Sequence, residues 1–263
     1  VSKTDSGWYY YRCFKGLTFL TLFTLWVRMK VLLTGGSGRV ATLVIPFLAK
    51  QHQLRIYDQN PPVDQSQEFL QGELTDPVGL EKAVEGMDAL IYLAMGSEDW
   101  DSWQGVDSAY DVNVKGLHFL LRSAQAAGIQ QAVYCSSMSV YADLRKRYFQ
   151  DEEIPPDETA LYGFTKWLGE EICRNAWRRW GIHTNALRLC HPTLKEKWMR
   201  ETQQGVTTIA TTDEDVASAM LAALELKAGF QAFMISGDFE QKIMCMAKAE
   251  RMMSWTPKAR PAN

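Results

Sequence analysis

Short apolar runs alternate with longer segments of helical periodicity from residue 31 to residue 235. Strands at the centre of a parallel sheet are buried on both faces, so they are continuously apolar rather than alternating. Such runs predict strands at residues 31–33, 54–57, 89–93, 132–135, 184–189 and 232–235. The apolar spacing between them predicts helices at residues 40–50, 77–86, 112–127, 162–180 and 213–226.

Regular alternation of strands and helices is typical of a doubly wound α/β fold with a parallel sheet. Gly128 and Gly181 follow two of the helical segments and are expected to end them. Residues 59–66 and 143–158 have the composition of loops, and residues 195–212 give no clear pattern. We therefore interpret residues 29–263 as a single domain with only a small substrate-binding part at its C-terminal end.

The first 28 residues do not share this pattern. An apolar run at residues 16–27 follows Arg12 and Lys15, which suggests a signal peptide or a membrane anchor. The run is shorter than the roughly 20 residues that cross a bilayer, and no small-residue cleavage site follows it. We favour residues 1–28 as an extension outside the fold, with Met29 as the natural start, over a membrane role.

The composition narrows the class of partner. The net charge of −3 gives no basic field for nucleic acid. The five cysteines are scattered without a Cys-x-x-Cys pair, which is typical of free thiols in a reducing compartment and indicates a cytoplasmic protein. Histidines and cysteines do not cluster at zinc-ligand spacing, so the sequence predicts no metal site.

A glycine-rich turn follows the first strand and opens the first helix. Its pattern, Gly35-x-x-Gly38-x-x-Ala41, lets the backbone approach a pyrophosphate at the helix N-terminus. Asp58 ends the next strand, where a carboxylate accepts hydrogen bonds from ribose hydroxyls and repels a 2′-phosphate. The turn therefore predicts a Rossmann fold that binds NAD rather than NADP, although Arg39 offers a charge for a 2′-phosphate.

The order of polar groups farther along the chain indicates redox chemistry. Tyr162 and Lys166 lie four residues apart, so they share one face of the predicted helix. A nearby ammonium favours the phenolate form of a tyrosine, which makes the pair suitable for acid/base catalysis. Ser137 ends an apolar strand upstream of the pair.

The stretch from Met29 to about Pro257 resembles the extended short-chain dehydrogenase/reductases, also called the NAD-dependent epimerase/dehydratase family. The resemblance rests on residues 34–38, 72–76 and 133–141 and on the Tyr-x-x-x-Lys pair, with Glu73 in place of the usual aspartate. It implies a catalytic set of Ser137, Tyr162, Lys166 and Asn113. The implied cofactor-binding set is Gly35, Gly36, Ser37, Gly38, Arg39, Val40, Asp58, Glu73, Leu74, Leu93, Ala94, Tyr162 and Lys166.

Within this family the length and the chain end, residues 253–258, resemble those of uronate dehydrogenases. That resemblance implies a small substrate and a strand arginine that clamps a carboxylate. Met138, Ala94 and Met95 depart from the pattern, and two tryptophans, Trp100 and Trp103, occupy a loop expected over the site. The implied substrate-binding residues are Ser97, Ser137, Met138, Tyr162 and Arg188.

The sequence thus predicts an NAD-dependent oxidoreductase that transfers a hydride between the nicotinamide and a small sugar-like alcohol, lactol or sugar acid. One alternative is a sugar or nucleotide-sugar epimerase/dehydratase that retains its NAD. Another is a non-catalytic NAD(P)-sensing protein, although the intact Ser137, Tyr162 and Lys166 argue against it. Family resemblance further implies a homodimer through the helices that contain Val112 and Tyr162.

Overall fold

The apolar runs of the chain form one parallel sheet. The structure is a computed structural model that describes residues 28–204 and 208–261. Within these residues seven strands are hydrogen-bonded in the order β3-β2-β1-β4-β5-β6-β7, and every neighbouring pair is parallel. The predicted doubly wound sheet is confirmed. The strands are β1 (Lys30–Thr34), β2 (Gln53–Asp58), β3 (Glu68–Gln71), β4 (Ala89–Tyr92), β5 (Gln131–Ser137), β6 (His183–Leu189) and β7 (Phe230–Ile235).

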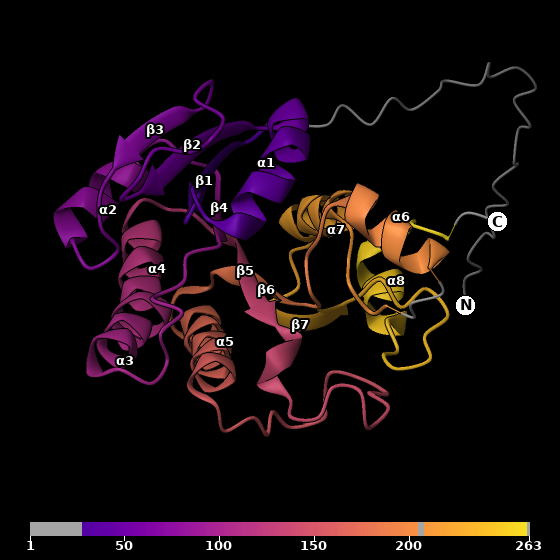
Figure 1. Cartoon of the computed structure of the whole chain (residues 1–263). Coiled ribbons are helices and arrows are strands. Elements are labelled where there is room, and N and C mark those ends of the chain that lie inside the picture. Colours follow the sequence, from indigo (N-terminus) through magenta and orange to yellow (C-terminus); the bar gives the residue numbers. More distant parts are fainter. Residues whose placement is uncertain (1–27, 205–207, 262–263) are drawn as a thin grey trace, which may run out of the picture.

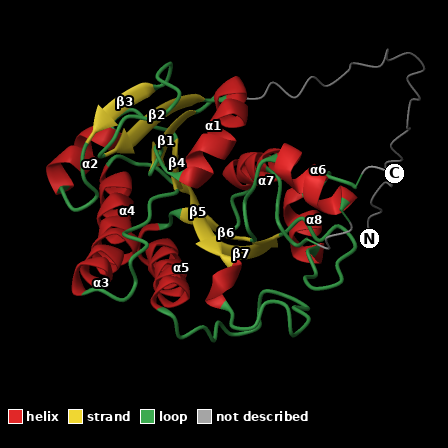
Figure 2. Ribbon diagram, viewed as in Figure 1, coloured by secondary structure: helices red, strands yellow, loops and turns green. Residues whose placement is uncertain are grey.

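Helices cover both faces of the sheet. The helices α2, α3, α4 and α5 lie on one side, and α1, α7 and α8 lie on the other (Figure 1). Figure 2 shows the sheet passing between these two layers. The helical elements are α1 (Arg39–Gln51), α2 (Pro77–Val84), α3 (Trp103–Tyr110), η1 (Asp111–Gly116), α4 (Leu117–Ala126), η2 (Met138–Val140), α5 (Leu161–Trp180), α6 (Lys195–Gln203), α7 (Asp213–Glu225) and α8 (Ala247–Met253).

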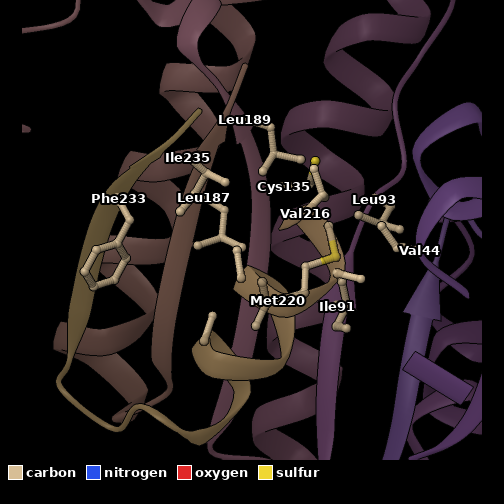
Figure 3. Close-up of a cluster of buried hydrophobic side chains, with 14 of the residues drawn as sticks. Val44, Ile91, Leu93, Cys135, Leu187, Leu189, Val216, Met220, Phe233 and Ile235 are labelled. Carbon is tan, nitrogen blue, oxygen red and sulfur yellow. The ribbon is translucent and has the colours of Figure 1, made fainter. Parts of the chain in front are cut away.

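Each face of the sheet has its own apolar core, because successive strand residues point to opposite faces. Leu33 of β1 belongs to the core beneath α1 and α7, whereas its neighbour Leu32 belongs to the core beneath α2 and α4. Figure 3 shows the first core, where Val44 of α1 and Met220 of α7 lie against side chains of β4, β6 and β7. The strands are continuously apolar in sequence because alternate residues of each strand are buried in the two cores.

The elements β3, α6 and α8 were not predicted from the sequence, and the helix after β4 begins earlier than expected. The edge strand β3 is only four residues long and half exposed, so it gives no apolar run. The helix expected at residues 112–127 begins earlier, at Trp103, where Ser102 caps α3 by accepting a hydrogen bond from the Gly105 N–H at 3.0 Å. The loop expected there is therefore shorter, and it ends before Trp103.

The segment after β6 and the chain end at residues 258–259 are both held near α7. Trp198 of α6 is fully buried and donates its indole N–H to the Ala210 carbonyl at 3.0 Å. The Asp215 carboxylate accepts the backbone N–H groups of Lys258 and Ala259 at 2.8 and 3.1 Å. Residues 195–203, which had no pattern in the sequence, are thus the helix α6. A small substrate-binding part in this region stays a prediction.

The interpretation of residues 1–28 falls almost entirely on residues outside those described. Between residues 28 and 261, apart from 205–207, no helix has both the length and the apolar character to cross a membrane.

Candidate active site

The glycine turn between β1 and α1 is shaped by close backbone contacts. Gly35 has a φ of +75°, and a Cβ there would lie 2.4 Å from the Ala94 nitrogen. A Cβ at Gly36 would lie 2.3 Å from Cγ2 of Ile56. Gly38 precedes the first turn of α1 with no side-chain cap, so the N–H groups of that turn stay open to an anion. The turn therefore fits the pyrophosphate of a dinucleotide.

Asp58 lies beside this turn at the end of β2. One carboxylate oxygen accepts the Ser37 N–H at 3.0 Å, and the other accepts the Asn60 N–H at 3.0 Å. The Ser37 hydroxyl also donates to the Asn60 carbonyl. These bonds place a carboxylate next to the phosphate-binding turn, where the predicted adenosine ribose would lie. Arg39 lies elsewhere, in the wall of the cavity that contains Tyr162.

The other predicted cofactor residues fall into two groups. Leu93 and Ala94 follow β4 and lie against the turn, with the Leu93 N–H donating to the Thr34 carbonyl at 3.0 Å. Glu73 and Leu74 lie beyond β3, where the Tyr57 hydroxyl donates to the Glu73 carbonyl at 3.0 Å. The second group is outside the cavity of Tyr162, as expected for residues on the adenine side.

A cavity of about 330 Å³ opens at the carboxyl ends of β5 and β6. Ligands of doubly wound sheets bind at this edge. Ser137, Met138 and Tyr162 all line it, as do Arg39 and Val40. The structure therefore brings together three of the predicted substrate residues and the end of the cofactor turn.

Lys166 lies beneath this cavity. Lys166 is 3% exposed, and its ammonium donates a hydrogen bond to the Cys135 carbonyl at 2.9 Å. It also lies 6.0 Å from the centre of the Tyr162 ring. Because the hydrogen-bond acceptor is a carbonyl rather than a carboxylate, the positive charge stays available to the neighbouring phenol.

The Ser137 oxygen is fixed at the last residue of β5. It accepts a hydrogen bond from the Ser139 N–H at 3.0 Å, the cap of the short helix η2. Its O–H remains able to donate, and it is directed by the same strand that places the Cys135 carbonyl on Lys166. Ser137 and Tyr162 thus line one cavity, and Lys166 bonds to Cys135 in its wall, while their catalytic roles stay a prediction.

Asn113 connects the loop after β4 with α5. Its side-chain oxygen accepts the Gly96 N–H at 3.0 Å, and its amide donates to the Thr165 hydroxyl at 3.0 Å. That hydroxyl donates in turn to the Tyr162 carbonyl at 3.1 Å. Asn113 lies in the π-helical segment η1, a rare geometry that occurs frequently at functional sites. Its role in proton transfer stays a prediction, whereas its bonds show a positioning contact.

Two predicted substrate residues lie outside the cavity. The Ser97 oxygen accepts the Asp99 N–H at 3.1 Å, and the Ser97 N–H bonds to Ser108, so its polar groups hold the loop. Arg188 points to the opposite side of β6, where it forms two hydrogen bonds to Glu170, at 2.9 and 2.7 Å. Side-chain alternation explains why Leu189 rather than Arg188 lines the cavity, and a substrate contact of Arg188 stays a prediction.

Other cavity residues were not predicted as ligands. Trp100, Leu144 and His191 line it together with Glu98 and Cys190. Partial desolvation and the charges of nearby arginines lower the pKa of His191 from 6.5, so it is neutral at pH 7. The position of His191 directly after a strand was the available signal, because the carboxyl ends of strands form such crevices.

The thiols near this cavity are buried. Burial raises the pKa of Cys190 to about 12 and also raises that of Cys135, so both stay protonated at neutral pH. The four cysteines in the described part of the chain are free. Among the same residues no cluster of three metal-binding side chains is found.

Comparison with known proteins supports the inference from the motifs. The model of the NAD dependent epimerase/dehydratase family matches residues 31–212, which includes the cofactor turn and all four catalytic candidates. The chain belongs to this family. The predicted family resemblance is confirmed. The prediction of NAD as the cofactor is confirmed with it, since the family is NAD-dependent.

Relatives differ in their named activities. A 3 beta-hydroxysteroid dehydrogenase/Delta 5→4-isomerase from Mycobacterium tuberculosis is 36% identical over 155 residues, which cover 54% of this chain and 41% of that protein. A uronate dehydrogenase from Pseudomonas syringae is 24% identical, over 61% of this chain and 58% of that protein. The chain thus spans less than two thirds of the length of these relatives.

Solved structures show the same fold. Uronate dehydrogenase from Agrobacterium tumefaciens superposes with a TM-score of 0.73 at 21% identity, covering 88% of this chain and 85% of that one. A short-chain dehydrogenase/reductase superfamily protein from the same organism, with bound NAD, gives 0.74 at 21% identity, covering 88% and 93%.

Proposed function

We propose that this chain is an NAD-dependent oxidoreductase acting on a small sugar-like alcohol, lactol or sugar acid. The observation that carries the proposal is the arrangement of Ser137 and Tyr162 around one cavity, with the ammonium of Lys166 buried beneath it. The glycine turn ends in the wall of the same cavity. A dinucleotide held by that turn would extend toward the cavity that Ser137 and Tyr162 line.

Each of the three side chains would have its own role in the oxidation of the substrate hydroxyl. Tyr162 would take the proton from the substrate hydroxyl, with the Lys166 ammonium 6.0 Å from the centre of its ring. The Ser137 O–H would donate a hydrogen bond to the substrate oxygen as it gains carbonyl character. Lys166 would also bind the hydroxyls of the nicotinamide ribose. Bound NAD would supply the hydride acceptor, while the protein positions the reacting atoms.

Asp58 is expected to set the choice between NAD and NADP. Replacing Asp58 with Asn removes the negative charge but leaves an oxygen for the Ser37 or Asn60 N–H groups. Losing a charged hydrogen bond to the ribose should weaken NAD binding by roughly 10- to 100-fold. Binding of NADP should weaken less or improve, because a 2′-phosphate no longer meets a carboxylate.

Titration calorimetry with NAD and with NADP measures this ratio. Asp64→Asn is a suitable control, because Asp64 lies in an exposed loop and bonds only to neighbouring Ser66 and Gln67. An unchanged ratio of the two affinities in Asp58→Asn would show that the carboxylate does not read the ribose.

An epimerase that keeps its NAD is the second candidate. Relatives named as epimerases also match, including a UDP-glucose 4-epimerase of Lactobacillus helveticus at 30% identity over 61% of this chain. Such an enzyme returns the hydride to its substrate, so it needs the same serine, tyrosine and lysine. A non-catalytic sensor is less favoured, because it has no use for the complete set.

Absorbance of the reduced nicotinamide tests these candidates. Purified protein is mixed with NAD, then with NADP, and with uronic acids, aldoses and nucleotide sugars. Steady reduction with a sugar or uronic acid supports the dehydrogenase. Isomerised product without net reduction supports the epimerase, and tight NAD binding with neither outcome would contradict both enzymes.

The proposal also includes an oligomeric state. We expect a cytoplasmic homodimer in which the continuous helix η1–α4, which contains Val112, and α5, which contains Tyr162, form a four-helix contact between the two copies. Light scattering after size exclusion gives the mass, and 29.9 kDa is the value for a single chain. A monomer at micromolar concentration would contradict the dimer without affecting the assignment of the active site.

A further inference from the structure

Two tryptophans lie close together in sequence but in very different surroundings. Trp100 lines the cavity, and its ring centre is 5.4 Å from that of Tyr162. Trp103, three residues later, is 86% exposed. Trp100 is thus the aromatic side chain beside the proposed acid/base, and any substrate on Tyr162 must lie near its indole.

The loop that contains Trp100 is tied to the helix that contains Tyr162. Gly96 bonds to Asn113, which bonds to Thr165 one turn into α5. At its other end, Ser102 caps α3. One hydrogen-bond network therefore joins the loop that contains Trp100 to the first turn of the helix that contains Tyr162.

The rest of the cavity lining is partly apolar and partly polar. Met138, Leu144 and Leu189 supply apolar surface, and Glu98 on the loop of Trp100 supplies an acceptor. A flat indole and apolar walls suit a molecule with a C–H face, and a carboxylate at the rim suits its hydroxyl groups. Rings of the pyranose or cyclohexane type have this combination, whereas a flexible open chain must lose more conformational freedom to match it.

We propose that Trp100 binds the C–H face of a cyclic secondary alcohol and so selects ring-shaped substrates over open-chain alcohols. The inference rests on the proposed oxidoreductase function and adds a substrate class to it. Trp100 acts here as a contact for the substrate, next to the residue that moves the proton.

Two alcohols of equal carbon number, cyclohexanol and hexan-2-ol, test the proposal, with D-glucuronate as a polar ring. Binding of each probe to the NAD-loaded protein is followed by indole fluorescence, and hexan-2-ol and D-glucuronate are also measured in competition with a fixed concentration of cyclohexanol. Turnover is followed as kcat and KM for every probe that is oxidised. The variants are Trp100→Ala, Trp100→Phe and the matched control Trp103→Ala.

The wild-type protein should bind cyclohexanol more tightly than hexan-2-ol. Trp100→Ala should weaken binding of both rings by roughly 3- to 10-fold, mainly through KM, and should bring the ratio of ring to chain close to one. Trp100→Phe should retain most of the preference. Trp103→Ala should match wild type, since that indole is exposed.

Several results would overturn the proposal. No preference for the ring in wild type, or an equal loss in Trp103→Ala, would show that the indole makes no selective contact. A fall in kcat for every probe, with KM unchanged and a shifted pH profile, would show that Trp100 only orients Tyr162. A failure of the proposed oxidoreductase mechanism would appear in a different measurement. Turnover would then be unchanged in Tyr162→Phe, while binding of the ring probes could still be measured.

Discussion

Replacing Tyr162 with Phe should lower turnover by roughly 10²- to 10⁴-fold while leaving NAD affinity nearly unchanged. The substitution removes only the hydroxyl that exchanges a proton with the substrate. The ring, and with it the 5.4 Å contact with Trp100, is retained. The Lys166 ammonium also keeps its hydrogen bond to the Cys135 carbonyl, so the floor of the cavity should not collapse.

Absorbance of the reduced nicotinamide gives the turnover, and titration calorimetry gives the NAD affinity. Tyr148→Phe is the matched control, since this tyrosine is 52% exposed and is not part of the cavity. Turnover in Tyr162→Phe equal to that of the control would refute Tyr162 as the acid/base. A parallel loss of NAD binding would instead indicate that the hydroxyl mainly serves the cofactor.

The parts of the site that the sequence predicted are those in which local spacing fixes the geometry. Residues four apart on a helix share a face, so Tyr162 and Lys166 had to lie together. Glycines at a strand–helix junction permit one kind of turn, and Asp58 at the end of the adjacent strand lies next to it. These features need no knowledge of distant contacts.

The positions that the sequence did not predict are those of side chains whose orientation depends on tertiary packing. Arg188 and Leu189 are neighbours in β6, and a strand directs them to opposite faces of the sheet. The motif placed the strand but not its register against α5, where Glu170 pairs with Arg188. Ser97 and Trp100 belong to one loop, which hydrogen bonds to Ser108 and Asn113 hold in place, and Trp100 rather than Ser97 lines the cavity.

The buried ion pair has a consequence for stability as well. Arg188 and Glu170 are 3% and 1% exposed, and the guanidinium makes two hydrogen bonds to the carboxylate. It also donates to the Tyr141 hydroxyl, and the Ser136 hydroxyl donates to Glu170 at 2.6 Å. The pair thus joins β6, α5 and β5 directly behind Ser137, which belongs to β5.

Arg188→Met should lower the free energy of unfolding by about 3–5 kcal/mol, because it leaves the Glu170 carboxylate buried without its countercharge. The double variant Arg188→Met/Glu170→Met should recover most of this loss, since apolar groups of similar size replace both charges. Urea denaturation of the single and double variants gives the coupling between the two positions.

A second arginine on the same protein provides the control. Arg147 also forms two hydrogen bonds to one carboxylate, that of Asp157, at 2.8 and 2.7 Å, but both side chains are more than a third exposed. Arg147→Met should therefore change stability by no more than about 1 kcal/mol. Equal losses at the two arginines would contradict the buried pair as the cause.

A role of Arg188 in binding a substrate carboxylate predicts a different result for Arg188→Met. The free energy of unfolding would be unchanged, and KM would rise for D-glucuronate but not for D-glucose. Because the guanidinium already satisfies Glu170 on the far side of β6, we expect the loss of stability and no such selectivity.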